Sequence, residues 1–158
     1  MDAGEFDEVI SLIYQNRFTD IEKLFKSGLD VRKKDNEGRT ILFHAVLDDN
    51  TALVSFFIKK GFEVNVQDNL GWTPLHHCAQ NYQTEIAKIL IENGADLEMN
   101  DNYGNTALFR AAFASQGKGD MIRLLLEHGA NRDSKNNAGV SPRQLANTIE
   151  NYDVKQFF

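Results

Sequence analysis

The chain repeats one short motif at a nearly constant spacing. The motif D-x-x-G-x-T begins at Asp35, Asp68 and Asp101, and a variant, N-N-A-G-V-S, begins at Asn136. The starts are separated by 33, 33 and 35 residues, and a glycine stands seven residues before each start. A period of this length is typical of proteins in which each small unit of structure packs only on its neighbours. The repeat therefore predicts a stack of similar units.

The motif divides residues 1–158 into the parts of one repeat domain. The part before Asp35 lacks the motif, but it contains apolar residues at helical spacing from Glu5 to Asn16. A second helix is expected to begin after a cap at Thr19 or Asp20 and to stop at Gly28. We expect an N-terminal cap at 1–34, full units at 35–67, 68–100 and 101–135, and a C-terminal cap at 136–158.

Each full unit is predicted to contain two helices. Thr40 and Thr73 are suitable N-cap residues, and Pro74 takes the first helical position, where a missing N–H has no cost. The first helix carries small residues and the second carries large apolar ones, so that neighbouring pairs can pack closely. His76 lies near the Thr73 cap, and we predict a structural role for it through a hydrogen bond to Thr73.

Two segments depart from the regular pattern. The third unit is two residues longer than the others, and alignment places the excess in the glycine-rich segment 115–119, which includes Lys118. This segment is either a tolerated lengthening or a loop that contacts a partner. The last unit stops early and contains Tyr152, Phe157 and Phe158, which predicts a cap closed by aromatic residues; a truncated chain is the alternative.

Charge and composition limit the choice of partner. Lys and Arg total 17 and Asp and Glu total 23, so the formal net charge is −6. This charge opposes attraction to the phosphates of nucleic acids and favours a basic protein. No basic leader or long apolar run is visible, so we expect a cytoplasmic protein without membrane association. A single cysteine forms no internal disulfide.

Candidate catalytic and cofactor sites are weak. The four histidines do not form H-E-x-x-H, and Cys78 has no second cysteine to share a metal. Cys78 occupies the place of alanines in the other units, which predicts a small core residue. The G-K-G at 117–119 lacks the spacing of a phosphate-binding loop. We therefore predict no enzyme activity, no cofactor and no metal.

Several stretches resemble ankyrin repeats. They are T-P-L-H-H-C-A with I-L-I-E-N-G-A-D, and N-T-A-L-F-R-A-A with L-L-L-E-H-G-A-N, and the resemblance runs from Phe6 to the end. It implies an all-α repeat solenoid, an elongated and curved ankyrin stack of L-shaped helix-turn-helix units joined by β-hairpin-like turns. Phe43 and Phe109 replace the expected histidine, and Ile41 and Ala107 the expected proline, which weakens local turns and not the fold.

A narrower resemblance concerns residues 136–158. This segment is similar to the ending of small bacterial ankyrin proteins, some of which accompany polymorphic toxins as immunity proteins. It implies a bacterial immunity protein, or antitoxin, that binds and neutralises a basic toxin or effector and is monomeric when free. A cytosolic adaptor or regulator that binds another protein is the alternative, and an enzyme or metal protein built on the repeat is a third possibility.

The resemblance also implies where a partner binds. In such proteins the hairpin tips and the exposed side of the first helices line a concave groove. Four large apolar residues fall at these positions, and such clusters mark interfaces, although they can also shield the edges of adjacent hairpins. Acidic neighbours would speed the encounter with a basic partner. The predicted partner-binding residues are Glu37, Arg39, Asp48, Leu70, Trp72, Tyr103, Asn105 and Phe113.

Overall fold

The computed structural model describes residues 3–28 and 33–158, so parts of the predicted N-terminal cap, residues 1–2 and 29–32, lie outside it. Within these ranges the chain forms nine α-helices and one 3-10 helix, and no strand. No helix in the described ranges has the length and apolar character needed to span a bilayer. The helices are α1 Ala3–Tyr14, α2 Phe18–Lys26, α3 Ile41–Leu47, α4 Thr51–Lys59, α5 Pro74–Asn81, α6 Thr84–Glu92, α7 Ala107–Ala114, α8 Asp120–Glu127, α9 Pro142–Thr148 and η1 Val154–Phe157.

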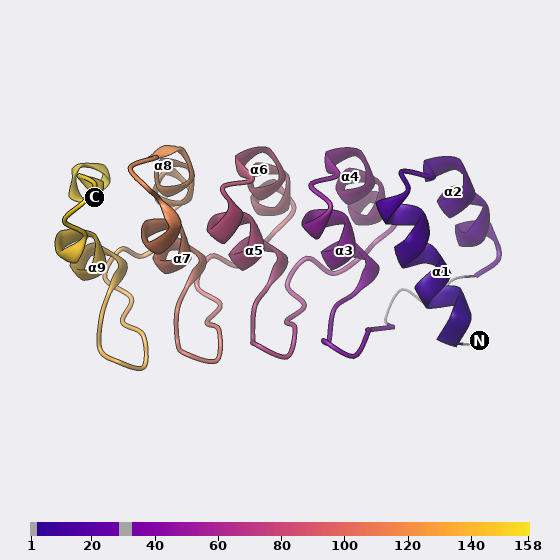
Figure 1. Ribbon diagram of the computed structural model, residues 1–158, viewed down its shortest axis with the longest axis horizontal. Coiled ribbons are helices and arrows are strands. Elements are labelled where there is room, and N and C mark those ends of the chain that lie inside the picture. The colour runs from indigo at the N-terminus through magenta and orange to yellow at the C-terminus, as the bar shows by residue number, and fades with distance from the viewer. Residues whose placement is uncertain (1–2, 29–32) are drawn as a thin grey trace.

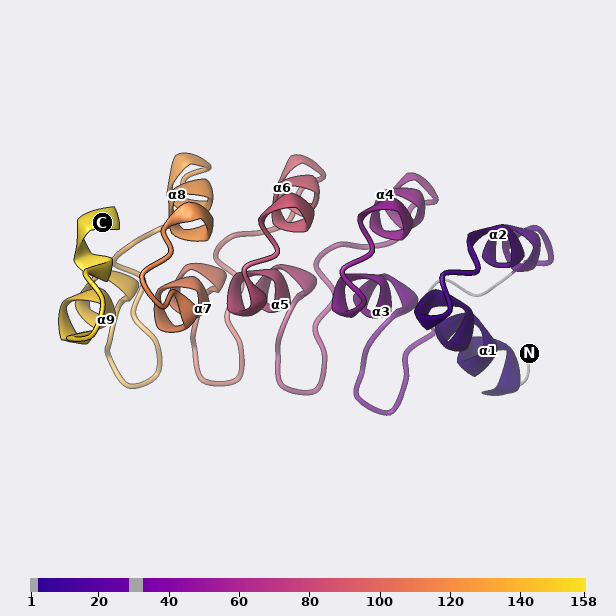
Figure 2. The same ribbon diagram turned by 45° about the horizontal axis from the view of Figure 1, so that its top comes forward.

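The helices are arranged in two rows along an elongated stack (Figure 1). The first helix of each pair, α1, α3, α5, α7 and α9, lies in one row, and α2, α4, α6, α8 and η1 lie in the other. Loops project from the first row at an angle to the helices, and the view in Figure 2 shows that both rows curve gently. The predicted all-α repeat solenoid is confirmed.

The small residues of the first helices let the rows pack closely. Ala45, Cys78 and Ala111 are completely buried, in agreement with the core position predicted for Cys78. The second helices fill the space between the rows with large side chains, among which Phe57 and Leu90 are also completely buried. Since each helix pair has apolar groups on the sides that face its neighbours, a pair can bury them only within the stack.

Hydrogen bonds at the helix starts differ between repeats. The hydroxyl of Thr73 accepts the backbone N–H of His76, and the ring Nδ1 of His76 accepts the N–H of Thr73, so the predicted contact is present. Thr40 has the same extended backbone, but its buried hydroxyl has no hydrogen-bond partner. The third residue after Thr40 is Phe43, which has no polar atom to offer. Phe43 therefore removes the side-chain half of this cap, and the hydroxyl half is absent as well, although Thr106 accepts the N–H of Phe109 at 3.4 Å in the third unit.

The predicted cap of α2 is wrong. The helix begins at Phe18, with Arg17 as its N-cap, and no side chain hydrogen-bonds to the free N–H groups. Asp20 lies inside the first turn, where it accepts a hydrogen bond from Lys23 at 3.0 Å. A carboxylate in the first turn is stabilised by the positive end of the helix dipole, which explains why Asp20 is tolerated within the helix.

The inserted segment 115–119 packs within the molecule. The Tyr82 hydroxyl lies 3.0 Å from the carbonyl oxygen of Ala111 and 2.8 Å from that of Lys118. Ser115 is buried, and a Cβ atom at Gly119 would collide with the ring of Phe157. The extra residues thus form a turn that fills the space between α5 and the C-terminal segment.

Successive loops approach so closely that some positions require glycine. Gly104 has φ +77°, and a Cβ atom there would lie 2.7 Å from the backbone nitrogen of Asn137. Gly139 has nearly the same conformation, φ +76°, but apart from its own and the two adjacent residues no atom of the described chain lies within 4 Å of the position of its Cβ. An alanine at either position would be strained by the positive φ, but only at position 104 would it also collide with the neighbouring loop. Comparing the two substitutions therefore separates these two effects on stability.

We predict that Gly104→Ala lowers the free energy of unfolding by about 2–4 kcal/mol, because strain at positive φ is added to a collision with the neighbouring loop. Gly139→Ala, the matched control, should lower it by only about 1 kcal/mol. Urea denaturation followed by circular dichroism measures both. Equal losses in the two variants would show that close packing of the loops contributes nothing.

The two threonine caps give a second comparison. Thr73→Val should lower the free energy of unfolding by about 1–2 kcal/mol, because it leaves helix N–H groups without partners. Thr40→Val should leave it unchanged or raise it slightly, since the hydroxyl that is removed is buried and forms no hydrogen bond. Thermal denaturation of the two variants under identical conditions is the test. A large loss in Thr40→Val would contradict this description of the first cap.

Candidate protein-binding surface

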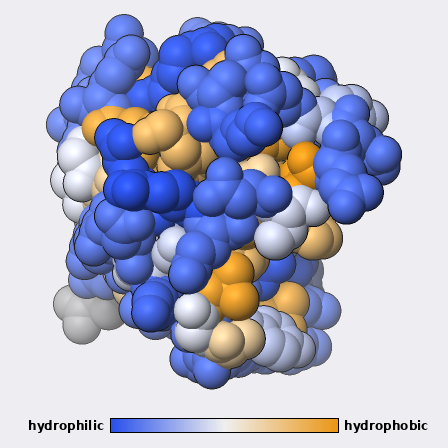
Figure 3. Space-filling model, turned by 90° about the vertical axis from the view of Figure 1, so that its left-hand side faces the viewer, coloured by the Kyte–Doolittle hydropathy of each residue, from blue (hydrophilic) through white to orange (hydrophobic). Residues whose placement is uncertain are grey.

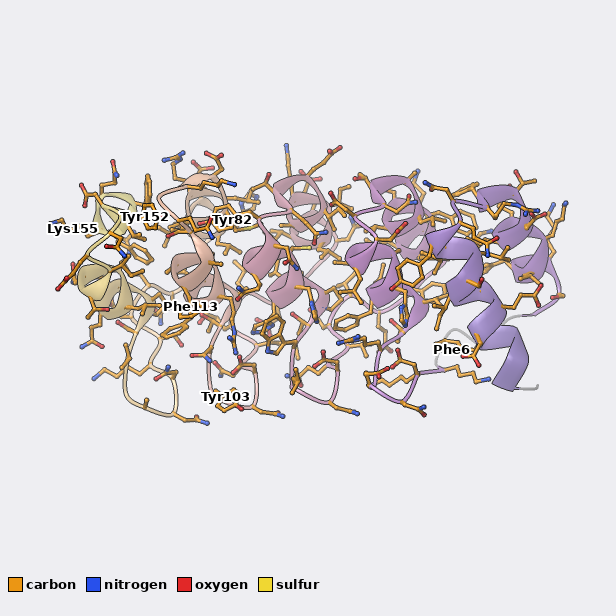
Figure 4. The ribbon with its side chains drawn as sticks, in the orientation of Figure 1. Phe6, Tyr82, Tyr103, Phe113, Tyr152 and Lys155 are labelled. Carbon is orange, nitrogen blue, oxygen red and sulfur yellow. The ribbon has the colours of Figure 1, made fainter. Side chains whose placement is uncertain are left out.

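Three of the predicted binding residues are large apolar side chains that face solvent. The exposed fraction is 52% for Leu70, 65% for Tyr103 and 63% for Phe113. Leu70 and Tyr103 occupy equivalent positions in the finger loops, a name used here for residues 35–40, 68–73, 101–106 and 136–141. Figure 4 shows Tyr103 at the end of the loop that precedes α7, and Phe113 between α7 and the loops in the same view. Leu70 and Tyr103 thus form an exposed apolar row on successive finger loops, and Phe113 is exposed on α7.

Backbone hydrogen bonds hold the finger loops in register. The N–H of Asn69 donates to the carbonyl of Glu37 at 2.8 Å, and the N–H of Asn102 donates to the carbonyl of Leu70 at 3.0 Å. The N–H of Asn137 donates in the same way to the carbonyl of Tyr103 at 3.0 Å. The side-chain amides of the three asparagines donate to the preceding loop as well. Consequently Leu70 and Tyr103 are presented from a fixed backbone and need little ordering when a partner binds.

One aspartate closes each finger loop. Oδ1 of Asp68 accepts the N–H groups of Leu70 and Trp72, both at 2.9 Å, and Asp35 and Asp101 accept the N–H groups two and four residues later in the same way. Asn136 keeps this arrangement, because the turn needs only one acceptor oxygen. The start of the repeated motif is therefore a structural turn.

The second oxygen of each aspartate binds a side chain nine residues later. Oδ2 of Asp35 lies 2.8 Å from Nε2 of His44, and Oδ2 of Asp68 lies 3.3 Å from Nε2 of His77. In the third unit Arg110 takes this position, and its Nε donates to Asp101 at 3.0 Å. Burial tends to raise the pKa of Asp101, but Arg110 and the N–H groups of its own loop outweigh it, so the pKa lies below the ordinary value of 3.8.

Trp72 is not a free residue at a tip, and this expectation is corrected. It is half-buried, with its ring centre 4.8 Å from that of His77. The guanidinium of Arg110 lies 4.4 Å from the centre of the Trp72 ring while it also binds Asp101. A cation held between an aromatic ring and a carboxylate is stabilised by both. Trp72 therefore links two repeats, and replacing it would disturb the stack.

Asn105 was predicted to face a partner, but the structure buries its side chain. Its side chain is buried, with the amide nitrogen 3.2 Å from Oδ2 of Asp101 and the amide oxygen accepting from Asn136 at 2.8 Å. A partner cannot reach it without breaking these bonds. Its position in the repeat is the one held by Trp72 and Arg39, and sequence alone did not show that the side chain turns inward.

The charged members of the predicted set lie in the first full unit. Glu37 is exposed at a loop tip, whereas Asp48 and Arg39 are half-buried. Nε of Arg39 lies 3.8 Å from Oδ2 of Asp68, so this guanidinium is directed at the next repeat and not at solvent. Of the charged residues in the predicted set, Glu37 and Asp48 are the two that a partner would meet at this end of the surface.

Three buried histidines form hydrogen bonds to the finger loops. Nδ1 of His44 accepts the hydroxyl proton of Tyr14 at 3.0 Å, while its Nε2–H donates to Asp35. Burial lowers the pKa of His44, His76 and His77 below 6.5, and the opposing effects of Asp35, of Asp68 and of a backbone carbonyl do not reverse it. All three rings are therefore neutral at pH 7, with the proton on Nε2.

The cysteine is buried and the remaining histidine bonds to its own helix. Burial raises the pKa of the Cys78 thiol far above its ordinary value, so the reactive thiolate is not formed at neutral pH. Nδ1 of His128 donates to the carbonyl of Leu124 at 2.8 Å. Among residues 3–28 and 33–158, no group of three or more His, Cys, Asp or Glu side chains has an arrangement suited to a metal ion.

Sequence analysis assigned none of three further residues to this surface, and it placed one of them, Tyr152, in the aromatic closure of the C-terminal cap. Tyr14 and Tyr152 are large side chains with exposed fractions of 50% and 45%, and Arg110 holds Trp72 and Asp101. Arg110 could have been found from its spacing, because it stands nine residues after the motif aspartate, as His44 and His77 do. Tyr14 and Tyr152 lie outside the full repeats, so no spacing indicated their exposure.

Comparison with known proteins identifies the repeat. A family model described as "Ankyrin repeats (3 copies)" matches residues 10–101, 56–137 and 78–154, which together span most of the chain. A search of curated proteins finds no significant match.

The buried histidines predict how stability depends on pH. Because their pKa values are lowered by folding, the unfolded chain takes up protons below about pH 6.5 that the folded chain does not. The free energy of unfolding should therefore change little between about pH 7 and pH 8 and fall steadily from about pH 6.5 to pH 5. Urea denaturation at each pH measures it.

His77→Phe is expected to make this decrease shallower, since one group that binds a proton only in the unfolded state is removed. His128→Gln is the control, because this side chain is exposed on the outside of the stack. A free energy of unfolding that does not change between pH 7 and pH 5 would show that the rings are protonated in the folded protein as readily as in the unfolded one.

Proposed function

The chain belongs to the ankyrin-repeat family, and on this premise we propose that it is a protein-binding module whose finger loops receive a basic protein. Ankyrin repeats indicate protein–protein interaction, and the family is typically a non-catalytic binding scaffold. The observation that carries the proposal is the exposed apolar row of Leu70 and Tyr103 on finger loops held in register by backbone hydrogen bonds, together with exposed Phe113 on α7.

The chemistry of this row favours a protein over a small molecule or a nucleic acid. Tyrosine and other aromatic residues are enriched at the centres of protein interfaces, where they provide contact area at low entropic cost. Exposed apolar side chains also reduce the solubility of a chain unless a partner covers them. Glu37 and Asp48, together with the net charge of −6, favour encounter with a positively charged surface.

We further propose that the partner is a cognate basic toxin, which the chain binds and neutralises as an immunity protein. Support comes from the acidic composition and from the similarity of residues 136–158 to the ending of bacterial ankyrin proteins of this type. The rigid finger loops also suit a protein that must block an active site by occupation alone. An adaptor that joins two proteins would instead need two separate binding faces.

Co-expression with the toxin encoded next to the gene of this chain should restore growth, and the purified pair should form a stable complex. The double variant Leu70→Ser and Tyr103→Ser should weaken the complex by on the order of tenfold or more and reduce protection, because both side chains belong to the exposed row. Calorimetry measures the affinity, and circular dichroism verifies that the variant is folded. Trp72 is left intact, since it supports Arg110.

The control is Lys59→Ala with Lys88→Ala, which changes two exposed residues on the second helices, away from the finger loops. It should protect as well as the wild-type chain. Binding without protection would favour the adaptor and contradict the immunity function. Unchanged affinity in the folded Leu70 and Tyr103 variant would rule out the finger loops as the interface.

A further inference from the structure

A pocket of about 430 Å³ lies where α7 and α9 end. Two aromatic and two aliphatic side chains, Phe113, Tyr152, Leu145 and Ile149, line it, and Glu150 stands at its edge. Figure 3 faces this end of the stack, where apolar patches appear between hydrophilic groups. The volume is within the range of pockets that receive a ligand group.

The aromatic walls of the pocket face solvent, and one of them, Tyr152, is supported by the inserted segment. Phe113 projects from the last turn of α7 with 63% of its surface exposed, and Tyr152 is 45% exposed. Tyr152 rests against the inserted segment, since a Cβ atom at Gly117 would lie 3.1 Å from its ring. Figure 4 shows both residues toward the C-terminal end of the stack. The two extra residues of the third unit thus help to support one wall.

The electrostatic character of the pocket is negative. Glu150 is the only residue with an acidic or basic charge that lines it. Both α7 and α9 point their C-terminal ends toward it, and the last carbonyl groups of a helix carry partial negative charge. Lys155 belongs to the neighbouring hollow, which it shares with Glu150 and Tyr152, and does not line this pocket.

The same combination of aromatic ring and carboxylate already binds arginine twice within the chain. Arg110 lies over Trp72 and binds Asp101. Arg123 lies 5.1 Å from the centre of the Phe157 ring and donates to Asp120 at 2.7 Å. The pocket provides Phe113 and Tyr152 with Glu150, but none of its lining residues is a lysine or an arginine.

We propose that this pocket binds an arginine side chain of the partner protein. The methylene groups would pack on Phe113 and Leu145, the planar guanidinium would stack on Tyr152, and Glu150 would accept its hydrogen bonds. Arginine fits better than lysine because its flat, weakly hydrated cation stacks on aromatic rings. The inference rests on the proposed function, which supplies a basic protein as the source of the arginine.

The test uses the full ¹⁵N-labelled chain and a capped amino acid, N-acetyl-arginine methylamide, followed by NMR. Residues 113 and 145–152 should shift in a saturable manner, whereas the citrulline analogue, which is uncharged but similar in shape, should cause no saturable shift. Glu150→Gln should weaken arginine binding about fivefold, and Tyr152→Leu should weaken it by a similar factor. Glu22→Gln, on exposed α2, is the matched control and should bind like the wild type.

Equal binding of arginine and citrulline, or unchanged binding in a folded Glu150→Gln variant, would overturn the assignment. The spectrum of each variant shows whether it is folded, and Tyr152→Leu gives a second measurement if Glu150→Gln disturbs the C-terminal segment. Failure of the proposed function gives a different result from failure of this assignment. In that case arginine still binds at the pocket, but the Leu70 and Tyr103 variant retains full affinity for the toxin.

Discussion

The stack depends on how the two oxygens of one carboxylate are used in each of the three full repeats. One oxygen of Asp68 accepts two backbone N–H groups and closes the finger loop, and the other binds His77 on the first helix. A single side chain therefore fixes the loop relative to the helix that follows it. Because neutral histidines and an arginine both satisfy the second oxygen, the position tolerates exchange, as Arg110 shows.

Hydrogen bonds also connect the closed finger loops of successive repeats. Asparagine N–H groups and side-chain amides connect each finger loop to the preceding one, so four loops form a continuous hydrogen-bonded edge. The edge holds its exposed side chains without further support, and Leu70 and Tyr103 are free to point outward. Such an arrangement suits recognition, because a rigid surface loses little conformational entropy on binding.

Contacts between repeats decide which side chains of the candidate surface a partner can reach. Trp72 and Asn105 occupy the same position in successive repeats, yet one contacts His77 and Arg110 and the other is buried against Asp101 and Asn136. The periodic pattern assigned both to solvent. Which of them is reachable depends on the side chain that the next repeat offers, and repeat spacing carries no information about that partner.

The sequence by itself determined the all-α repeat architecture, the capping role of His76 and the core position of Cys78. These follow from local turn chemistry and from spacing along the chain. Only the tertiary structure decided that Thr40 lacks a cap partner, that Trp72 faces a neighbouring repeat and that Tyr152 forms a pocket with Phe113. The reason is physical: exposure depends on groups that are distant in sequence and become neighbours only when the units stack.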